Sequence, residues 1–237
     1  MDFQTLSSAY TGATATGYDA RRAPTAKWVS EDSAVRELLR AVRSGATVTD
    51  MPVGTGRFLK LYHERGFKVV GRDISPDMLR AARVKLDDAD GLDCTLELAD
   101  IRAIPDADGT YDCALSIRFL NWMEARGLEE VLRELRRVSK RHLIVGIRHQ
   151  VPVGELLLHG PNGFRRLIVG RLLGLRRFAR RLLRHPRAND PHTIQHRKDV
   201  VLGTFDALKL GIDAMILVEH GRDGTDYCFY RLTKDTS

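Results

Sequence analysis

Cysteine is scarce in this chain: its 237 residues contain three, Cys94, Cys113 and Cys228, at scattered positions. So few thiols exclude a disulfide framework and fit reduced cysteines in a cytoplasmic protein. Their spacing lacks the pairs that hold zinc, so we expect no metal. No run of about 18 uncharged apolar residues occurs, which excludes a transmembrane helix. The first five residues also lack the basic-then-apolar pattern of a signal peptide.

Acidic residues are missing from one segment, residues 164–187, which contains nine arginines and no Asp or Glu. The whole chain has 38 Lys and Arg against 31 Asp and Glu, a net charge of +7. Without those nine arginines, 29 basic residues face 31 acidic ones. The 43% of hydrophobic residues excludes wholesale disorder, and the length fits one large domain. The basic excess therefore belongs to one segment of a nearly neutral protein.

Strand-like and helix-like segments alternate from residue 46 onward. The expected helices span about 57–65, from 76 past Leu86, 128–138 and 199–210. The expected strands are 47–51, 68–73, 95–100, 111–117, 143–147, 214–218 and 227–232. Alternation of this kind predicts parallel βαβ units and an α/β sheet covered by helices on both faces. Only eight residues join the last two strands, too few for a crossover helix, so the seventh strand must be antiparallel to its neighbour.

Two further segments flank or interrupt this core. Residues 31–42 have helical spacing, with Ser30 as the expected N-cap and Gly45 as the end. We therefore divide the chain into three parts. They are an N-terminal arm and lid helix (1–45), a core (46–149 and 192–237) and an Arg-rich helical insertion (150–191).

A glycine turn and two acids follow three consecutive strands. Gly54 and Gly56 follow the first strand, Asp73 ends the second, and Asp100 ends the third. Ligands of open α/β sheets bind beyond the carboxyl ends of the strands. Each feature alone has an ordinary structural explanation, as a tight turn, a helix cap or an Asx turn. Their occurrence in order indicates a nucleoside site.

The glycine turn lacks the features that bind phosphates. Arg57-Phe58-Leu59 follows Gly56, so the third glycine of a dinucleotide fingerprint is absent. No Gly-Lys-Ser/Thr sequence occurs, which excludes a P-loop. A nucleoside cofactor without phosphates fits better.

The motifs in this order resemble those of class I S-adenosylmethionine-dependent methyltransferases. Residues 50–56, Asp-Met-Pro-Val-Gly-Thr-Gly, resemble the family's first motif, and residues 70–79 its ribose-binding strand and helix start. Residues 98–101 resemble the adenine-contacting segment, and residues 111–116 the fourth-strand motif. The resemblance covers about 46–149 by motif and 196–234 by topology. It implies a Rossmann-like fold with S-adenosylmethionine as cofactor.

The resemblance also implies roles for single residues. Asp50 would hold the methionine amino group, Asp73 the ribose hydroxyls and Asp100 the adenine amino group. The other expected cofactor contacts are Pro52, Gly54, Thr55, Gly56, Ile74, Met78, Ile101, Ile117 and Arg118. Pro52 stands where the family usually has its first glycine, so the turn must form without that N–H.

Methyl transfer is an in-line displacement, in which an enzyme contributes chiefly alignment and exclusion of water. A base is needed only if the acceptor carries a proton at attack. His149, just beyond the fifth strand, is the candidate base, and Arg118 the candidate for orienting the donor carboxylate or an acidic substrate. Structural or surface roles remain open for both. The candidate substrate and lid residues are Tyr18, Phe119, Trp122, His192 and His196.

The residues after the fourth strand bear on the acceptor. They read Ile-Arg-Phe-Leu-Asn-Trp (117–122) and lack the Asn-Pro-Pro-Tyr sequence of base-flipping enzymes. We expect methylation of O or N in a small molecule. The alternatives are a lipid acceptor at an anionic membrane or a phosphate-bearing partner such as RNA, docked by residues 164–187, and a non-catalytic adenosyl-binding module. A plain lid helix is the other interpretation of that segment, and the sequence leaves the acceptor and any oligomer open.

Overall fold

A computed structural model describes residues 25–88, 91–153, 194–221 and 224–234, together with Asp19 and six single positions between 158 and 172. In these ranges the strands are β1 Thr47–Asp50, β2 Lys68–Asp73, β3 Cys94–Leu98, β4 Tyr111–Ser116, β5 Ser139–Gln150, β6 His196–Arg197, β7 Leu210–His220 and β8 Thr225–Lys234. The helices are α3 Ala26–Leu38, η1 Leu39–Ala41, α4 Leu59–Glu64, α5 Pro76–Asp87, η2 Leu120–Trp122, α6 Ala125–Val138 and α9 Lys198–Ala207.

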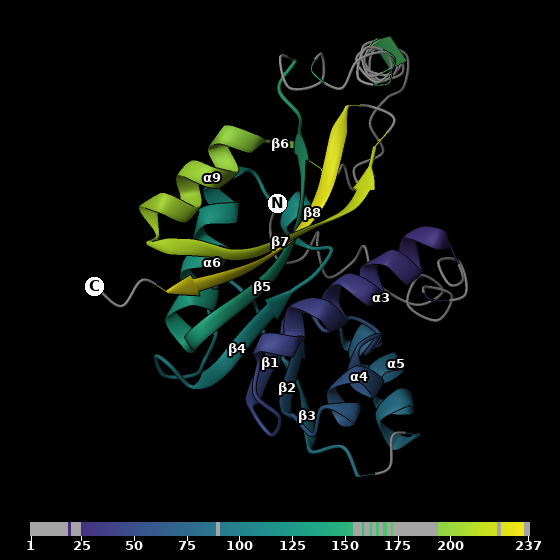
Figure 1. The fold of residues 1–237 in the computed structure, drawn as a ribbon. Coiled ribbons are helices and arrows are strands. Elements are labelled where there is room, and N and C mark those ends of the chain that lie inside the picture. The colour runs from purple at the N-terminus through teal and green to yellow at the C-terminus, as the bar shows by residue number, and fades with distance from the viewer. Residues whose placement is uncertain are drawn as a thin grey trace, which may run out of the picture.

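The strands form one mixed sheet in the order β3-β2-β1-β4-β5-β8-β7, and β6 pairs with β5 (Figure 1). Strands β1 to β5 are parallel to one another, whereas β8 runs antiparallel to both β5 and β7. The predicted α/β fold, its seven strands and the reversed last strand are therefore confirmed. The two-residue strand β6 was not predicted, because so short a segment carries no periodicity.

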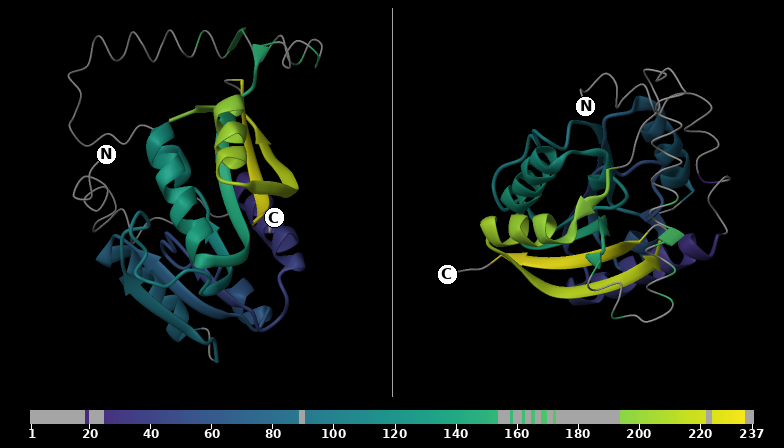
Figure 2. Two further views of the ribbon diagram at one scale, coloured as in Figure 1. Left: turned by 90° about the vertical axis from the view of Figure 1, so that its left-hand side faces the viewer. Right: turned by 90° about the horizontal axis from the view of Figure 1, so that it is seen from above.

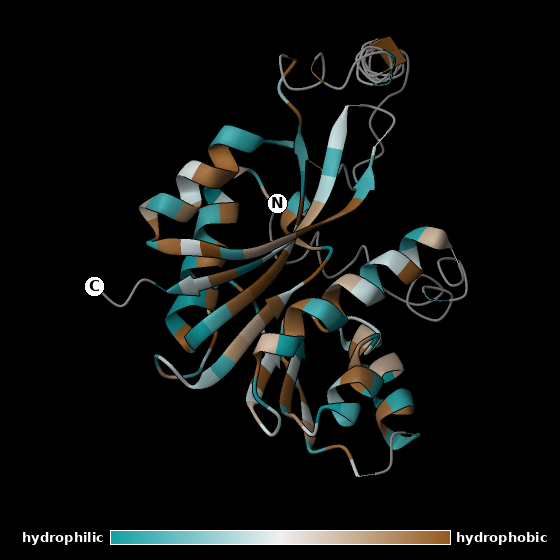
Figure 3. Ribbon diagram, viewed as in Figure 1, coloured by the Kyte–Doolittle hydropathy of each residue, from teal (hydrophilic) through white to brown (hydrophobic). Residues whose placement is uncertain are grey.

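Helices cover both faces of the sheet, and each face has its own hydrophobic core (Figures 1 and 2). One core joins α6 and α9 to the sheet, and the other joins α3 and α4 to the opposite face. In α6, the residues that pack inward recur at helical spacing: Leu128, Val131, Leu132, Leu135 and Val138 are all fully buried. Figure 3 shows the result, with apolar residues in the strands and mixed helix surfaces. The two layers leave the carboxyl ends of β1, β2 and β4 available for a site.

Of the two N-caps predicted from the sequence, Ser75 is correct and Ser30 is not. Ser75 caps α5 as expected: its hydroxyl accepts a hydrogen bond from the Met78 N–H at 3.3 Å, with Pro76 in the first turn. The expectation that Ser30 caps the N-terminal helix is wrong, because α3 begins at Ala26. Thr25 is extended and accepts from the Trp28 N–H at 3.2 Å, whereas the Ser30 hydroxyl donates to the Ala26 carbonyl inside the helix.

The insertion leaves and rejoins the core beside the end of β4. The Ile194 N–H donates to the Asn121 carbonyl at 2.5 Å, and the Asn121 amide donates to the Ile194 carbonyl at 2.8 Å. Most of residues 154–193, including the Arg-rich segment 164–187, lies outside the described residues, so its predicted helix and partners stay predictions. In the parts of the chain that are described, no helix is long and apolar enough to span a bilayer.

Candidate functional site

An open cavity lies at the carboxyl ends of β1, β2 and β4. Eleven of its lining residues were predicted from the sequence: Asp50, Pro52, Gly54, Thr55, Asp73, Ile74, Met78, Ile117, Arg118, Phe119 and Trp122. Three others, Val53, Arg57 and Phe58, were missed, although they adjoin the glycine turn. The structure thus brings most of the predicted donor and acceptor contacts to one place.

Asp73 ends β2 and is fixed by backbone donors on two sides. Its Oδ2 accepts from the Gly54 N–H at 2.9 Å, and its Oδ1 accepts from the Ser75 N–H at 2.8 Å. Burial raises the pKa of this carboxyl to about 6, and the backbone hydrogen bonds limit the rise. Its two oxygens are therefore held in place at the cavity wall, where they can accept further hydrogen bonds.

Asp50 ends β1 and is buried at the opposite side of the glycine turn. The Tyr62 hydroxyl of α4 donates to Asp50 Oδ2 at 2.8 Å. Burial raises the pKa of Asp50 to about 7; the Tyr62 hydrogen bond lowers it, and the nearby charge of Asp73 raises it. Two carboxylates thus make this half of the cavity acidic and suit it to a cationic ligand.

The glycine turn contributes to the site in two different ways. Gly54 has a φ of 57°, lines the cavity, and has open space where a Cβ would stand. Gly56 has a φ of 71° and does not line it; its Cβ would lie 2.6 Å from Leu59 Cδ1 and 3.2 Å from Ala82 Cβ. Gly56 therefore permits the close approach of α4 and α5, rather than contact with a ligand.

The wall that follows β4 is apolar except for Arg118. Ile117, Arg118 and Phe119 follow β4 and all line the wall, together with Trp122. Arg118 has a φ of 64°, and its carbonyl accepts a hydrogen bond from Trp122 Nε1 at 3.2 Å. This turn presents consecutive side chains to the cavity.

Helix α3 supplies a carboxylate that sequence reasoning missed. Glu31 is fully buried, and its Oε2 lies 2.5 Å from Arg57 Nη1 and 3.3 Å from Arg118 Nη1. Arg57 also pairs with Asp32 and stacks on the Trp28 ring at 3.5 Å. No local pattern identifies Glu31, because its partners follow β1 and β4 in the sequence.

Besides Gly56, four predicted residues are described but do not line the cavity: Asp100, Ile101, His149 and His196. Arg102 donates to both oxygens of Asp100, at 3.0 Å from Nε and 2.6 Å from Nη2. The buried His149 ring lies with Nε2 2.8 Å from the Tyr230 hydroxyl, and His196 Nε2 lies 3.1 Å from the Leu120 carbonyl. The roles given to these residues stay predictions. Tyr18 and His192 lie outside the described residues.

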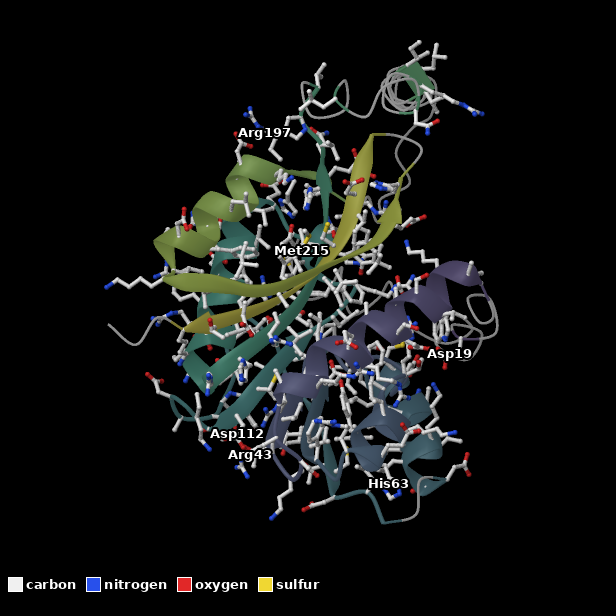
Figure 4. The ribbon with its side chains drawn as sticks, in the orientation of Figure 1. Asp19, Arg43, His63, Asp112, Arg197 and Met215 are labelled. Carbon is white, nitrogen blue, oxygen red and sulfur yellow. The ribbon has the colours of Figure 1, made fainter. Side chains whose placement is uncertain are left out.

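Asp19, labelled in Figure 4, contacts a residue of the cavity wall. The Thr55 hydroxyl donates to Asp19 Oδ1 at 2.8 Å, and Lys85 of α5 forms an ion pair with the same carboxylate. A residue next to the expected lid residue Tyr18 therefore touches the glycine turn.

Comparison with known proteins identifies this arrangement. Residues 48–142 match a family model described as a methyltransferase domain. Residues 48–142 therefore form a domain similar to the S-adenosylmethionine-dependent methyltransferases. The matched residues hold β1 to β4 and the cavity-lining motifs, so the resemblance predicted from those motifs is confirmed.

Two curated relatives match the chain over part of their length. A demethylmenaquinone methyltransferase of Thermus thermophilus is 37% identical over 94 residues, which is 38% of this chain and 41% of that protein. One from Thermobifida fusca is 33% identical over 97 residues, 41% of this chain and 40% of that protein. The chain thus matches about two fifths of the length of these curated relatives.

Solved structures share the fold over nearly the whole chain. Magnesium protoporphyrin IX methyltransferase from Synechocystis PCC 6803, with bound S-adenosylhomocysteine, has a TM-score of 0.65 at 16% identity, covering 98% of this chain and 94% of that one. The Burkholderia thailandensis 1,6-didemethyltoxoflavin-N1-methyltransferase has a TM-score of 0.65 at 14% identity, and the match covers 98% of this chain and 88% of that one. At such identities the likeness shows the fold.

Proposed function

We propose that this chain binds S-adenosylmethionine in the cavity and transfers its methyl group to an O or N atom of a small molecule. One observation carries the proposal: Asp73, fixed by two backbone N–H groups, lies beside the glycine turn with its carboxylate at the cavity wall. Such a carboxylate accepts hydrogen bonds from paired ribose hydroxyls.

The residues of the acidic half fit the donor. Asp50 and Asp73 supply acceptor oxygens and negative charge for a molecule that carries an ammonium and a sulfonium, and Ile74 and Met78 add apolar wall. When bound, S-adenosylmethionine supplies an electrophilic methyl carbon on a positively charged sulfur. The chain's own task is to align the acceptor with that carbon and exclude water.

The residues after β4 fit a small, largely apolar acceptor. Ile117, Phe119 and Trp122 offer hydrophobic and aromatic surface on the wall after β4. The relatives act on molecules of this kind, as their names show: demethylmenaquinone and magnesium protoporphyrin IX. During transfer, an acceptor lone pair forms the new C–O or C–N bond while the C–S electron pair stays on sulfur, leaving S-adenosylhomocysteine. A proton leaves the acceptor if its reacting atom carries one.

Calorimetric titration with S-adenosylmethionine and S-adenosylhomocysteine tests the binding step. The wild-type chain should bind both, Asp73→Ala should abolish binding, and the exposed Asp206→Ala should leave it unchanged. No binding to the wild type, or unaltered affinity in folded Asp73→Ala, would refute the proposal.

Turnover separates an enzyme from a binding module. Release of S-adenosylhomocysteine should follow addition of quinol, phenol, carboxylate or amine acceptors. Binding without turnover on any of them would favour the non-catalytic module. His149→Gln tests the expected base: a Gln can hydrogen-bond to Tyr230 but cannot take up a proton near neutral pH, so catalysis should fall while donor affinity holds.

A further inference from the structure

The two halves of the cavity differ in charge. Asp50 and Asp73 place carboxylates at the ends of β1 and β2, whereas the wall after β4 has Arg118 among Ile117 and aromatic rings. A ligand that spans both halves matches this pattern if it carries a cationic group near the two carboxylates and an anionic group near Arg118. This charge pattern bears on the acceptor, which the proposed function leaves open.

The backbone turn at Arg118 sets its side chain at the wall. Its φ of 64° lies in the left-handed region, which an arginine seldom adopts. Trp122 Nε1 donates to the Arg118 carbonyl at 3.2 Å, and Trp122 itself lines the cavity. Uncommon backbone conformations of this kind gather at ligand sites. The turn thus holds a cationic side chain and an aromatic ring at the same wall.

Arg118 shares its carboxylate partner with a second arginine. Glu31 Oε2 lies 2.5 Å from Arg57 Nη1 but 3.3 Å from Arg118 Nη1. Arg57 has further partners in Asp32, the Trp28 carbonyl and the Trp28 ring. An anion that binds Arg118 would leave Glu31 its shorter pair with Arg57. The Arg118 side chain is 25% exposed, so it can be reached from the cavity.

We propose that Arg118 binds an anionic substituent of the methyl acceptor, while the rings of Phe119 and Trp122 contact its apolar body. This rests on the proposed function, because it assigns the acceptor to the half of the cavity away from Asp73. The acceptor class that follows is an aromatic or otherwise apolar molecule bearing a carboxylate or a similar planar anion. A guanidinium recognises such a group with two parallel N–H donors.

Two probes that differ only in charge test this assignment: 2-naphthoate and its neutral amide, 2-naphthamide. Each is titrated calorimetrically into protein saturated with S-adenosylhomocysteine, so that the donor half is filled. In the wild type, naphthoate should bind about ten-fold more tightly than naphthamide, as expected for hydrogen bonds to a charged group. Arg118→Met should remove the difference without weakening naphthamide, and Arg118→Lys should keep part of it. Arg126→Met, a charge loss on the exposed side of α6, should preserve the full ratio.

The outcomes separate this inference from the proposed function. If the wild type fails to bind S-adenosylhomocysteine, the proposed function fails first. If it binds, then an equal affinity for both probes, a ratio unchanged in Arg118→Met, or no binding of either probe overturns the acceptor assignment. A donor role for Arg118 is detected separately. In that case Arg118→Met would weaken S-adenosylmethionine but spare 5′-methylthioadenosine, which lacks the carboxylate, and the assignment would be wrong.

Discussion

The Tyr62 hydroxyl donates a 2.8 Å hydrogen bond to Asp50, and both side chains are buried. This contact ties α4 to the end of β1 across the glycine turn. A buried carboxylate without a donor is costly, so the position of Tyr62 bears on both folding and the charge of the site.

Tyr62→Phe removes this donor and keeps the ring. Because the hydrogen bond lowers the pKa of Asp50, its loss should raise that pKa further. At pH 8, where Asp50 is ionised, the variant should lose about 1.5–3 kcal/mol of unfolding free energy, the usual range for a hydrogen bond to a charged group. At pH 5, where Asp50 is protonated, the loss should be smaller. Urea unfolding at the two pH values measures both, and an equal loss at each would contradict the charge-dependent role.

The raised pKa values of Asp50 and Asp73, about 7 and about 6, predict pH-dependent donor binding. A cationic ligand needs the ionised carboxylates, so affinity for S-adenosylmethionine should fall as the pH drops from 8 to 5. The stability of the ligand-free protein should show the opposite trend. Folded carboxyls with raised pKa values hold protons more tightly than unfolded ones, so their contribution to stability grows as pH falls from about 7 toward 4.

Asp73→Asn is the variant that checks this pH dependence. It should bind S-adenosylmethionine weakly at pH 8 and lose part of the decline toward pH 5, as measured by calorimetry. The exposed Asp206→Asn should keep the wild-type profile. A wild-type affinity that stays flat between pH 8 and 5 would contradict the role of the two carboxylates.

Two glycine-to-alanine changes should have opposite effects on stability. At Gly56, a Cβ meets Leu59 and Ala82 and the φ is 71°, so Gly56→Ala should destabilise the fold by at least 1–2 kcal/mol, roughly the cost of a left-handed L-residue alone. At Gly203, exposed in α9, an added Cβ would meet no neighbouring group within 4 Å, so Gly203→Ala should stabilise the fold by about 0.5–1 kcal/mol. Thermal unfolding of both variants tests the pair; a neutral Gly56→Ala would show that α4 and α5 adjust.

The fold was predictable because hydrophobic periodicity and strand-end motifs are local signals. The eight-residue link before β8 was enough to predict its reversal, and the Ser75-Pro76 pair marked the start of α5. The start of α3 was missed by several residues, since Thr25 and Ser30 are both suitable caps and only the first has the extended backbone that a cap requires. Boundaries of this kind depend on backbone conformation, which residue type does not determine.

The donor half of the site was predictable, whereas its polar supports were not. Asp73 and the glycine turn follow from their places at strand ends. Glu31 and Tyr62 lie on helices, at positions that look like ordinary helix surface or core, and they acquire their roles only when α3 and α4 pack on the sheet. Asp100 shows the converse: a motif position was identified, but its carboxylate is engaged by Arg102, two residues away.

Asn121 joins the acceptor wall to both ends of the insertion. Its amide donates to the Arg148 and Ile194 carbonyls at 2.6 and 2.8 Å, and its Oδ1 accepts from the Arg148 N–H at 2.7 Å. Asn121→Asp cannot donate to the two carbonyls when ionised. The variant should lose at least about 1–3 kcal/mol of unfolding free energy, the cost of one unsatisfied buried group. The loss should be larger at pH 8 than at pH 4. The exposed Asn162→Asp should change the unfolding free energy little. If urea unfolding fails to distinguish the two variants, the Asn121 hydrogen bonds do not stabilise the fold as proposed.

Asp19 should retain the bound donor rather than stabilise the fold. Its carboxylate is partly exposed and pairs with Thr55 and Lys85, and such exposed pairs contribute about 0–1 kcal/mol to folding. Because Thr55 lines the cavity, loss of the contact should separate Asp19 from the glycine turn. Asp19→Ala and Lys85→Met should each speed dissociation of S-adenosylmethionine by up to about five-fold, the rate equivalent of that energy. Stopped-flow displacement measures this rate.

Glu130→Ala, which breaks a surface pair on α6, should leave the dissociation rate unchanged. If Asp19→Ala releases the donor at the wild-type rate, the contact with the arm plays no part in retention and Tyr18 loses its structural support as a lid residue.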